Sequence, residues 1–127
     1  MDINKICDEL IKEFPEKAEK VKRHEKDYGE ILGHVLYAEE FNEPLIELLD
    51  KYIELEVIEK YCNFIEYMWK NGDEVVVNIV DVTIVERLSE EEDIWNKFGK
   101  NISQEFKEYI NKELIPANII MNEVNPL

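Results

Sequence analysis

The feature that most constrains this chain is the helical spacing of its apolar residues. In residues 54–70 they recur at intervals of three and four, as on one face of an α-helix. That face would hold Val57, Ile58, Tyr61, Cys62, Ile65, Met68 and Trp69. The opposite face would hold Glu56, Glu59, Asn63, Glu66 and Lys70. The segment therefore predicts an amphipathic helix that buries one side against a protein core.

The same spacing, punctuated by proline, glycine and capping residues, continues along the rest of the chain. Pro15 is expected to separate a first helix from a second, which ends at Gly29. A third helix is expected to run to about Glu40. Asn42 is then predicted to cap a fourth helix that has Pro44 in its first turn. Four short helices thus precede the long one at 54–70.

Two serines carry the start signals of the last helices. Ser89 begins an S-x-x-E capping box, and Ser103 is expected to cap the final helix, which Pro116 ends. The C-terminal tail, residues 117–127, has no period. It is expected to dock through its apolar residues Ile119, Ile120 and Met121.

Residues 75–85 (VVVNIVDVTIV) fit two secondary structures. Their β-branched side chains favour a strand, but the alternation fails because Asp81 shares a strand face with valines and an isoleucine. On a helix, Glu74, Asn78 and Asp81 fall together and apolar residues cover the remainder. We prefer a nearly buried helix capped by Asp73, and a small hairpin near residues 70–85 is the alternative.

These signals predict an all-α protein in which residues 1–127 form a single domain of about seven short helices. A helical bundle and a short α-solenoid-like stack both fit the pattern. The 127 residues, 45% of them hydrophobic, are enough to build a core without disulfides or metals. Cys7 and Cys62 are accordingly expected to be buried free thiols, with a disulfide as the alternative.

The net charge of −15 excludes two classes of partner. Nucleic acid and anionic membrane surfaces both require clustered lysine and arginine, so no direct binding to either is expected. The chain starts without an apolar signal sequence, and a cytoplasmic location is the expectation. The charge is concentrated: residues 30–66 hold two basic and ten acidic side chains, and residues 67–96 hold two and eight.

Chemistry-bearing motifs are absent from the sequence. His24 lies among charged residues, and His34, with Glu30 four residues before it, has too few ligands around it for zinc or a di-iron centre. Ser89 and Ser103 are explained as caps, and no phosphate-binding or dinucleotide-binding glycine loop occurs. We therefore expect no catalytic residue, no cofactor and no metal, and a protein that is not an enzyme.

The run from Asn78 to Ile110 resembles a family of small bacterial proteins. The likeness is carried by a V-D-V-(T/S)-(I/V)-(V/L)-E-x-L pattern, a short acidic helix with an aromatic residue, and a final helix. The matching positions are Val80, Asp81, Val82, Thr83, Ile84, Val85, Glu86 and Leu88. Members look like immunity proteins of polymorphic or contact-dependent toxin systems. The resemblance implies an all-helical, non-enzymatic inhibitor of a cognate toxin, in keeping with a nuclease-type basic toxin domain.

Aromatic residues interleaved with the acidic ones suggest where a basic protein partner would bind. Charge would steer the encounter, and desolvated aromatic side chains would supply the binding energy. The predicted partner-binding residues are Tyr37, Glu39, Glu40, Phe41, Glu43, Glu47, Glu56, Glu59, Glu66 and Tyr67. A general adaptor or nucleic-acid mimic is the main alternative, and a carboxylate-metal helical-bundle enzyme is a third. A monomer is slightly favoured over a dimer formed through the tail.

Overall fold

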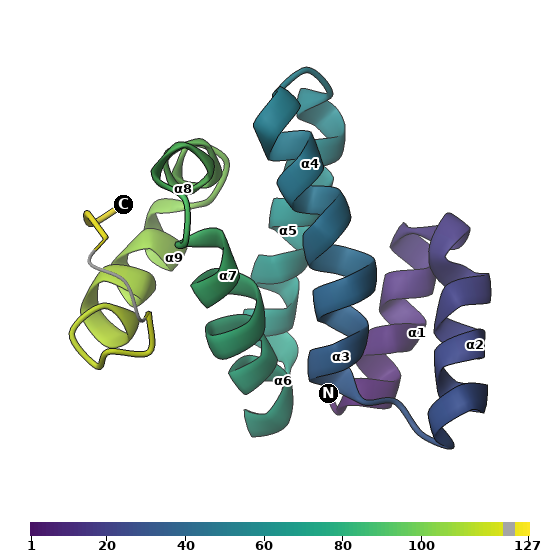
Figure 1. The fold of residues 1–127 in the computed structure, drawn as a ribbon. Coiled ribbons are helices and arrows are strands. Elements are labelled where there is room, and N and C mark those ends of the chain that lie inside the picture. Colours follow the sequence, from purple (N-terminus) through teal and green to yellow (C-terminus); the bar gives the residue numbers. More distant parts are fainter. Residues whose placement is uncertain (121–123) are drawn as a thin grey trace.

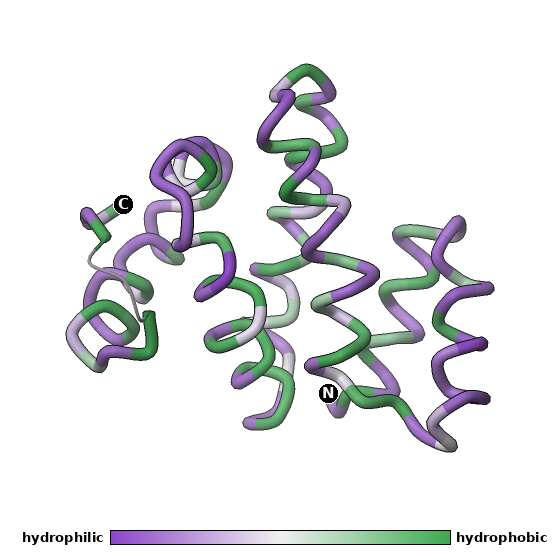
Figure 2. The backbone as a smooth tube through the Cα atoms, viewed as in Figure 1, coloured by the Kyte–Doolittle hydropathy of each residue, from purple (hydrophilic) through white to green (hydrophobic). Residues whose placement is uncertain are grey.

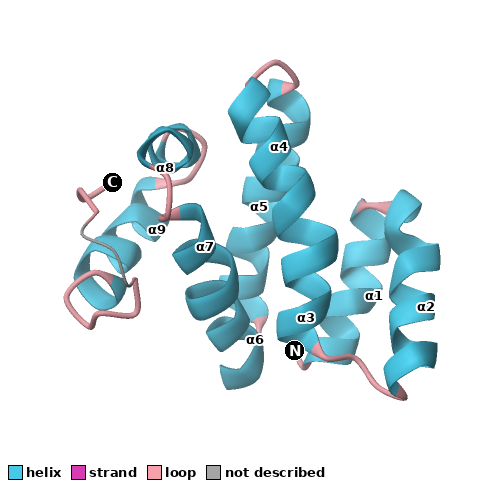
Figure 3. Ribbon diagram, in the orientation of Figure 1, coloured by secondary structure: helices cyan, strands magenta, loops and turns pink. Residues whose placement is uncertain are grey.

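The computed structural model describes residues 1–120 and 124–127, and Figure 3 shows this part of the chain as helices joined by loops, without a strand. The predicted all-α fold in one compact domain is confirmed. The hairpin near residues 70–85 is wrong, because the chain is continuously helical from Glu74 to Leu88. Met121, one of the predicted tail contacts, lies outside the described residues.

Seven continuous helical stretches make up the described chain, as the sequence predicts. Several combine α-helix with 3₁₀ (η1) or π-helical (η2–η4) segments. In order they are α1 (Ile3–Glu13); η1 (Pro15–Lys17) with α2 (Ala18–Tyr28); α3 (Gly33–Tyr37) with η2 (Ala38–Asn42) and α4 (Glu43–Lys51); α5 (Leu55–Asn71); α6 (Glu74–Asn78) with η3 (Ile79–Val85) and α7 (Glu86–Leu88); α8 (Glu92–Gly99); and α9 (Gln104–Tyr109) with η4 (Ile110–Leu114).

The helices are arranged across the molecule roughly in chain order. In Figure 1, α1 and α2 lie together at one end, α8 and α9 lie at the other, and the remaining helices fill the space between them. Figure 2 shows hydrophilic and hydrophobic residues alternating along the helices. Buried and exposed residues also follow one another at helical intervals, as the spacing in the sequence predicts, except that Val57, predicted on the buried face of residues 54–70, is 37% exposed.

The third and fourth predicted helices are one helix, and the prediction that Asn42 caps a new one is wrong. Asn42 has helical backbone angles (φ −63°, ψ −48°), and its side chain caps nothing. Pro44 lies inside this helix, where it cannot donate to the carbonyl of Glu40 four residues earlier. A widened π turn, η2, precedes the proline and accommodates it. Asn42 followed by Pro44 is typical of a helix start, and this is why the sequence predicted one here instead of a π turn within a continuous helix.

A buried lysine completes this proline break. The Lys17 ammonium, from η1, donates to the Glu40 carbonyl at 2.6 Å. It also lies 5.1 Å from the centre of the Tyr61 ring, in a cation–π arrangement. Burial lowers the pKa of Lys17. This hydrogen bond joins η1, at the start of α2, to η2, in the middle of the helix that runs from α3 to α4.

Aromatic rings fill the core between α1, η2 and α5. Phe14 lies 4.6 Å from Tyr61 and 5.9 Å from Phe64, between ring centres. Phe41 lies 4.9 Å from Tyr61 and 5.6 Å from Tyr37. Pairs at these separations gain energy beyond the area that they bury. The aromatic residues of the acidic segment therefore build the core to a large extent.

The two π segments of the middle of the chain meet face to face. The Asn42 side-chain amide donates to the Thr83 carbonyl at 2.8 Å, and the Thr83 hydroxyl hydrogen-bonds His34 Nδ1. Gly33 allows the close approach, because a Cβ at this position would lie 2.3 Å from a methyl carbon of Ile79. Asn42, predicted as a cap, instead joins two helices.

Most of the predicted helix ends are correct. Gly29 ends α2 with a positive φ of 76°, and Asp73 and Ser103 accept hydrogen bonds from Val76 N and Phe106 N as N-caps. Ser89, like Asn42, is not an N-cap, since its hydroxyl donates to the carbonyl of Glu86, the first residue of α7. The residue before α8 is Glu91, and its side chain makes no capping bond.

Both cysteines are buried free thiols, as expected. Burial raises the pKa of each thiol to about 12. The described part of the tail contacts the body: the Trp95 indole donates to the Asn125 carbonyl at 2.9 Å, and Leu127 N donates to Asn111 Oδ1 at 2.8 Å. Ile120 is buried as well.

Asp81 is a buried carboxylate with one side-chain partner. The Tyr109 hydroxyl donates to both of its oxygens, at 2.9 and 2.8 Å. Burial raises the pKa of Asp81, and this hydrogen bond partly offsets the rise because it favours the ionised form. The ionised carboxylate therefore lowers the stability of the folded state.

We expect the effect of Asp81→Asn on the free energy of unfolding to depend on pH. Asp81 has a higher pKa folded than unfolded, so its stabilising contribution is complete below the unfolded pKa and is lost as pH rises through the folded one. Urea unfolding at pH 3.5 and 7 should show that the free energy of unfolding of the variant rises relative to that of the wild type as pH rises. Tyr109→Phe should steepen the wild-type loss. A difference between variant and wild type that is the same at both pH values contradicts this role.

Candidate partner-binding site

Two of the predicted contact residues are not on the surface. Tyr37 and Phe41 are both 0% exposed, so the prediction that they anchor a partner is wrong. Both rings lie at i, i+4 spacing on the same face of this continuous helix as Leu45, which is also 0% exposed, and their centres are 5.6 Å apart in the aromatic core. Burial raises the pKa of the Tyr37 hydroxyl well above its ordinary value. These rings stabilise the fold and leave the carboxylates around them on the surface.

The remaining predicted residues of α4 and η2 line one broad hollow, which we call the α4 hollow. Its volume is about 620 Å³. Its lining comprises Lys20, Glu39, Glu40, Glu43, Pro44, Ile46, Glu47, Asp50 and Glu91. Two of these carboxylates already have partners: Glu40 pairs with Lys20 at 3.5 Å, and Glu47 pairs with Lys51 at 3.0 Å. Exposed pairs of this kind contribute little stability and break readily.

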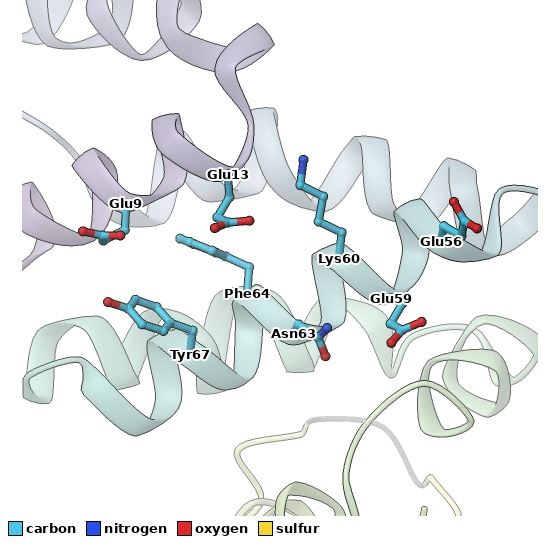
Figure 4. Close-up of a pocket in the computed structure, with 8 residues that line it drawn as sticks. All are labelled: Glu9, Glu13, Glu56, Glu59, Lys60, Asn63, Phe64 and Tyr67. Atoms are coloured by element: carbon cyan, nitrogen blue, oxygen red, sulfur yellow. The ribbon is translucent and has the colours of Figure 1, made fainter.

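A second, smaller site lies between α1 and α5, and we call it the α1–α5 pocket. Its volume is about 360 Å³. Its lining comprises Glu9, Glu13, Glu56, Glu59, Lys60, Asn63, Phe64 and Tyr67. Figure 4 shows Glu9 and Glu13 on one helix facing Phe64 and Tyr67 on the other. Three of the predicted residues, Glu56, Glu59 and Tyr67, meet here.

The α1–α5 pocket combines negative charge with aromatic surface. Four glutamates and one lysine, Lys60, line the pocket, and the Lys60 ammonium lies 4.6 Å from the centre of the Phe14 ring. Glu9 pairs with Lys12 at 3.0 Å, and the described residues place no ion-pair partner beside the other three. The Phe64 and Tyr67 rings lie 5.9 Å apart between centres. Such a pocket suits a lysine or arginine side chain, which carboxylates and ring faces both attract.

Glu66 makes a structural contact with the start of α9. Its carboxylate accepts from Ser103 N at 2.9 Å and also from the Ser103 hydroxyl. Ser103 in turn caps α9. The Glu66 side chain thereby fixes the start of α9 against α5. With Glu59 and Tyr67 it also lines a hollow of about 680 Å³, and its role in binding a partner stays a prediction.

Sequence reasoning missed four carboxylates of these sites, Glu9 and Glu13 in the α1–α5 pocket and Asp50 and Glu91 in the α4 hollow. Glu9 and Glu13 lie four residues apart on α1, in a segment whose basic and acidic residues nearly cancel. Glu91 reaches the α4 hollow from the start of α8. Counting charge along the chain hides such residues, because the sites gather side chains from helices distant in sequence. The i, i+4 spacing of Glu9 and Glu13 was the available signal.

The described part of the chain contains neither a cluster of metal ligands nor a membrane-spanning helix. Among residues 1–120 and 124–127, no three histidine, cysteine, aspartate or glutamate side chains are placed to hold a metal ion. Within the same residues, none of the helices has the length and apolar character needed to cross a bilayer. His24 is buried and accepts a hydrogen bond from Leu32 N at 2.9 Å, so it is not the solvated residue that its charged neighbours suggest.

Replacing Glu66 with glutamine should lower the free energy of unfolding by about 1 kcal/mol. The amide keeps one acceptor oxygen and loses the charge that strengthens both bonds to Ser103. Glu59→Gln, on the same helix but exposed, is the matched control and should leave stability close to wild type. Urea denaturation of both variants measures the difference. Equal losses would show that charge alone, rather than the contact with Ser103, sets the effect.

No curated protein and no solved structure matches the chain. A family model with the description "Domain of unknown function (DUF7674)" matches residues 7–116. This range begins in α1 and ends just after η4, so it takes in nearly all of the helical body. The chain belongs to the DUF7674 family.

Proposed function

We propose that this protein is a non-enzymatic immunity protein that binds a cognate basic toxin domain of a bacterium and neutralises it. The observation that carries the proposal is the α1–α5 pocket, which four glutamates, Phe64 and Tyr67 line on a chain of net charge −15. The resemblance of residues 78–110 to toxin-immunity proteins supports the same function.

The resemblance and the pocket contribute to the proposal in different ways. Val80, Ile84, Val85 and Leu88 of the shared pattern are fully buried, and Asp81 bonds internally to Tyr109. The pattern therefore specifies the fold. Recognition of one toxin would depend on exposed residues outside it, such as Glu56 and Glu59, which can vary without disturbing the core.

Charge and shape would act at different stages of binding. The excess of carboxylates attracts a basic surface over several ångströms and raises the association rate, an effect that salt weakens. In the bound state, a lysine or arginine of the toxin would enter the α1–α5 pocket and contact the Phe64 and Tyr67 rings. A nuclease toxin covered in this way loses the basic surface with which it grips phosphate.

Co-expression with the toxin encoded immediately upstream of the gene tests the function. We expect survival of cells that carry both proteins, and a complex of the two on a sizing column. Growth arrest despite expression, together with no complex, would reject the proposal. Binding to many unrelated basic proteins with equal affinity would favour a general adaptor instead.

Glu56→Gln with Glu59→Gln should slow association with the toxin about 10-fold at low salt. Glu108→Gln with Glu113→Gln is the matched control, because it removes the same charge from exposed positions of α9 and η4. Stopped-flow or surface-plasmon measurements should show a much smaller change, about 2-fold, for the control. Equal slowing by both pairs would mean that net charge, and not the α1–α5 pocket, guides the encounter.

A further inference from the structure

Exposed apolar side chains are concentrated at the connection between α4 and α5. Ile53 is 75% exposed, Leu55 50% and Val57 37%. The other large apolar side chains this exposed in the described chain, Met1, Tyr28 and Val75, lie elsewhere. We call residues 52–57 the α4–α5 tip. The tip projects at one end of the molecule in Figure 1, and Figure 2 shows hydrophobic residues there. Apolar residues grouped in this way on a soluble protein mark interaction surfaces.

The α4–α5 tip is held in a fixed shape by contacts with the rest of the protein. Tyr52 ends α4 in the left-handed region, with φ 52° and ψ 41°, a conformation that costs a side-chain-bearing residue about 1 kcal/mol. Its hydroxyl accepts from Asn101 Nδ2 at 3.0 Å, and the Lys97 ammonium lies 5.5 Å from its ring centre. Lys97 also donates to the Asp50 carbonyl at 3.2 Å. The turn that presents Ile53 is therefore pre-organised for binding.

The α4–α5 tip is bordered by residues that belong to each of the two acidic sites. A small hollow of about 290 Å³ beside Ile53 shares Pro44 and Glu47 with the α4 hollow. On the other side of the tip, Glu56 belongs to the α1–α5 pocket. Asp50, Glu54 and Glu56 are exposed around the apolar residues. A single partner seated on the tip would thus contact both acidic sites.

We propose that the α4–α5 tip is the desolvated centre of the interface with the basic toxin domain. Ile53 and Leu55 would enter an apolar cavity of that partner, while its lysine and arginine side chains meet the carboxylates on either side of the tip. This inference rests on the proposed function and names the residues that supply its binding energy. Apolar contacts at the centre with charged residues at the rim are the usual anatomy of a tight interface.

Charge decides between a basic partner and a second copy of this chain. Two copies meeting tip to tip would place Glu47, Asp50, Glu54 and Glu56 of one against the same residues of the other, as a twofold interface requires. Lys51 is the only base among residues 47–57, and it is already paired with Glu47. Like charges opposed in this way weaken association, whereas a basic domain neutralises them.

The test measures binding to the catalytically inactivated toxin domain encoded immediately upstream, at low and high salt. The wild type is compared with Ile53→Ser combined with Leu55→Ser, and with Val75→Ser as a control of similar exposure on α6. The tip variant should dissociate at least about 30-fold faster while its association rate changes by less than about 3-fold. The control should stay within about 3-fold of wild type in both rates. Circular dichroism verifies that all three are folded.

The outcomes separate the two proposals. If the wild type binds and the tip variant binds equally well, the tip is not the interface and the immunity function stands. If the wild type does not bind at all, the immunity function falls and the inference falls with it. Sedimentation of the free protein supplies a further check, since a wild-type dimer that the tip variant abolishes would assign the tip to self-association and overturn the inference.

Discussion

At the centre of the fold, Pro44 denies the Glu40 carbonyl the N–H of a regular helix, and the Lys17 ammonium donates to it instead, at 2.6 Å. Much of the structure follows from this substitution. The π turn before the proline keeps α3 and α4 in one helix, and this continuity directs Phe41 into the core. Phe41 then packs against Tyr61 of α5 and Phe14 of α1. The buried Lys17 thus supplies the donor that the Glu40 carbonyl lacks. In doing so it helps to set the relative positions of α1, α2, α5 and the helix that runs from α3 to α4.

The acidic surface is organised by packing rather than by position in the sequence. Glu13 and Glu59 come from segments of very different net charge, and they line one pocket because it lies between α1 and α5. Most aromatic rings of the acidic segment are buried. Tyr67 is half-buried and lines the α1–α5 pocket, and the exposed apolar residues Ile53 and Leu55 lie at the α4–α5 tip. In the proposed complex, the exposed carboxylates would raise the association rate with a basic partner. The apolar residues of the α4–α5 tip would lower the dissociation rate.

Helical spacing was sufficient to predict the architecture, because each helix buries a face whose period is written in local sequence. It also placed Asp73, Ser103 and Gly29 correctly, since capping depends on nearest neighbours. It failed where tertiary contacts override local signals. Asn42 and Ser89 have the chemistry of caps, but a helix that tolerates an internal proline leaves nothing at Asn42 to cap. For the site, Glu56, Glu59 and Tyr67 line one pocket, and their role in binding a partner stays a prediction. The burial of Tyr37 and Phe41 was missed because the helix was expected to end before Asn42, whereas in one continuous helix both share a face with the buried Leu45.

The two buried thiols have a practical consequence. Cys7 lies on α1 and Cys62 on α5, the helices that form the walls of the α1–α5 pocket. Because burial holds the pKa of each near 12, almost no thiolate exists at neutral pH, and a maleimide or disulfide reagent can react only when a helix opens. The rate of labelling at Cys7 therefore reports how often α1 opens, and the rate at Cys62 reports how often α5 opens. A ligand in the α1–α5 pocket that holds α1 against α5 would lower both labelling rates together.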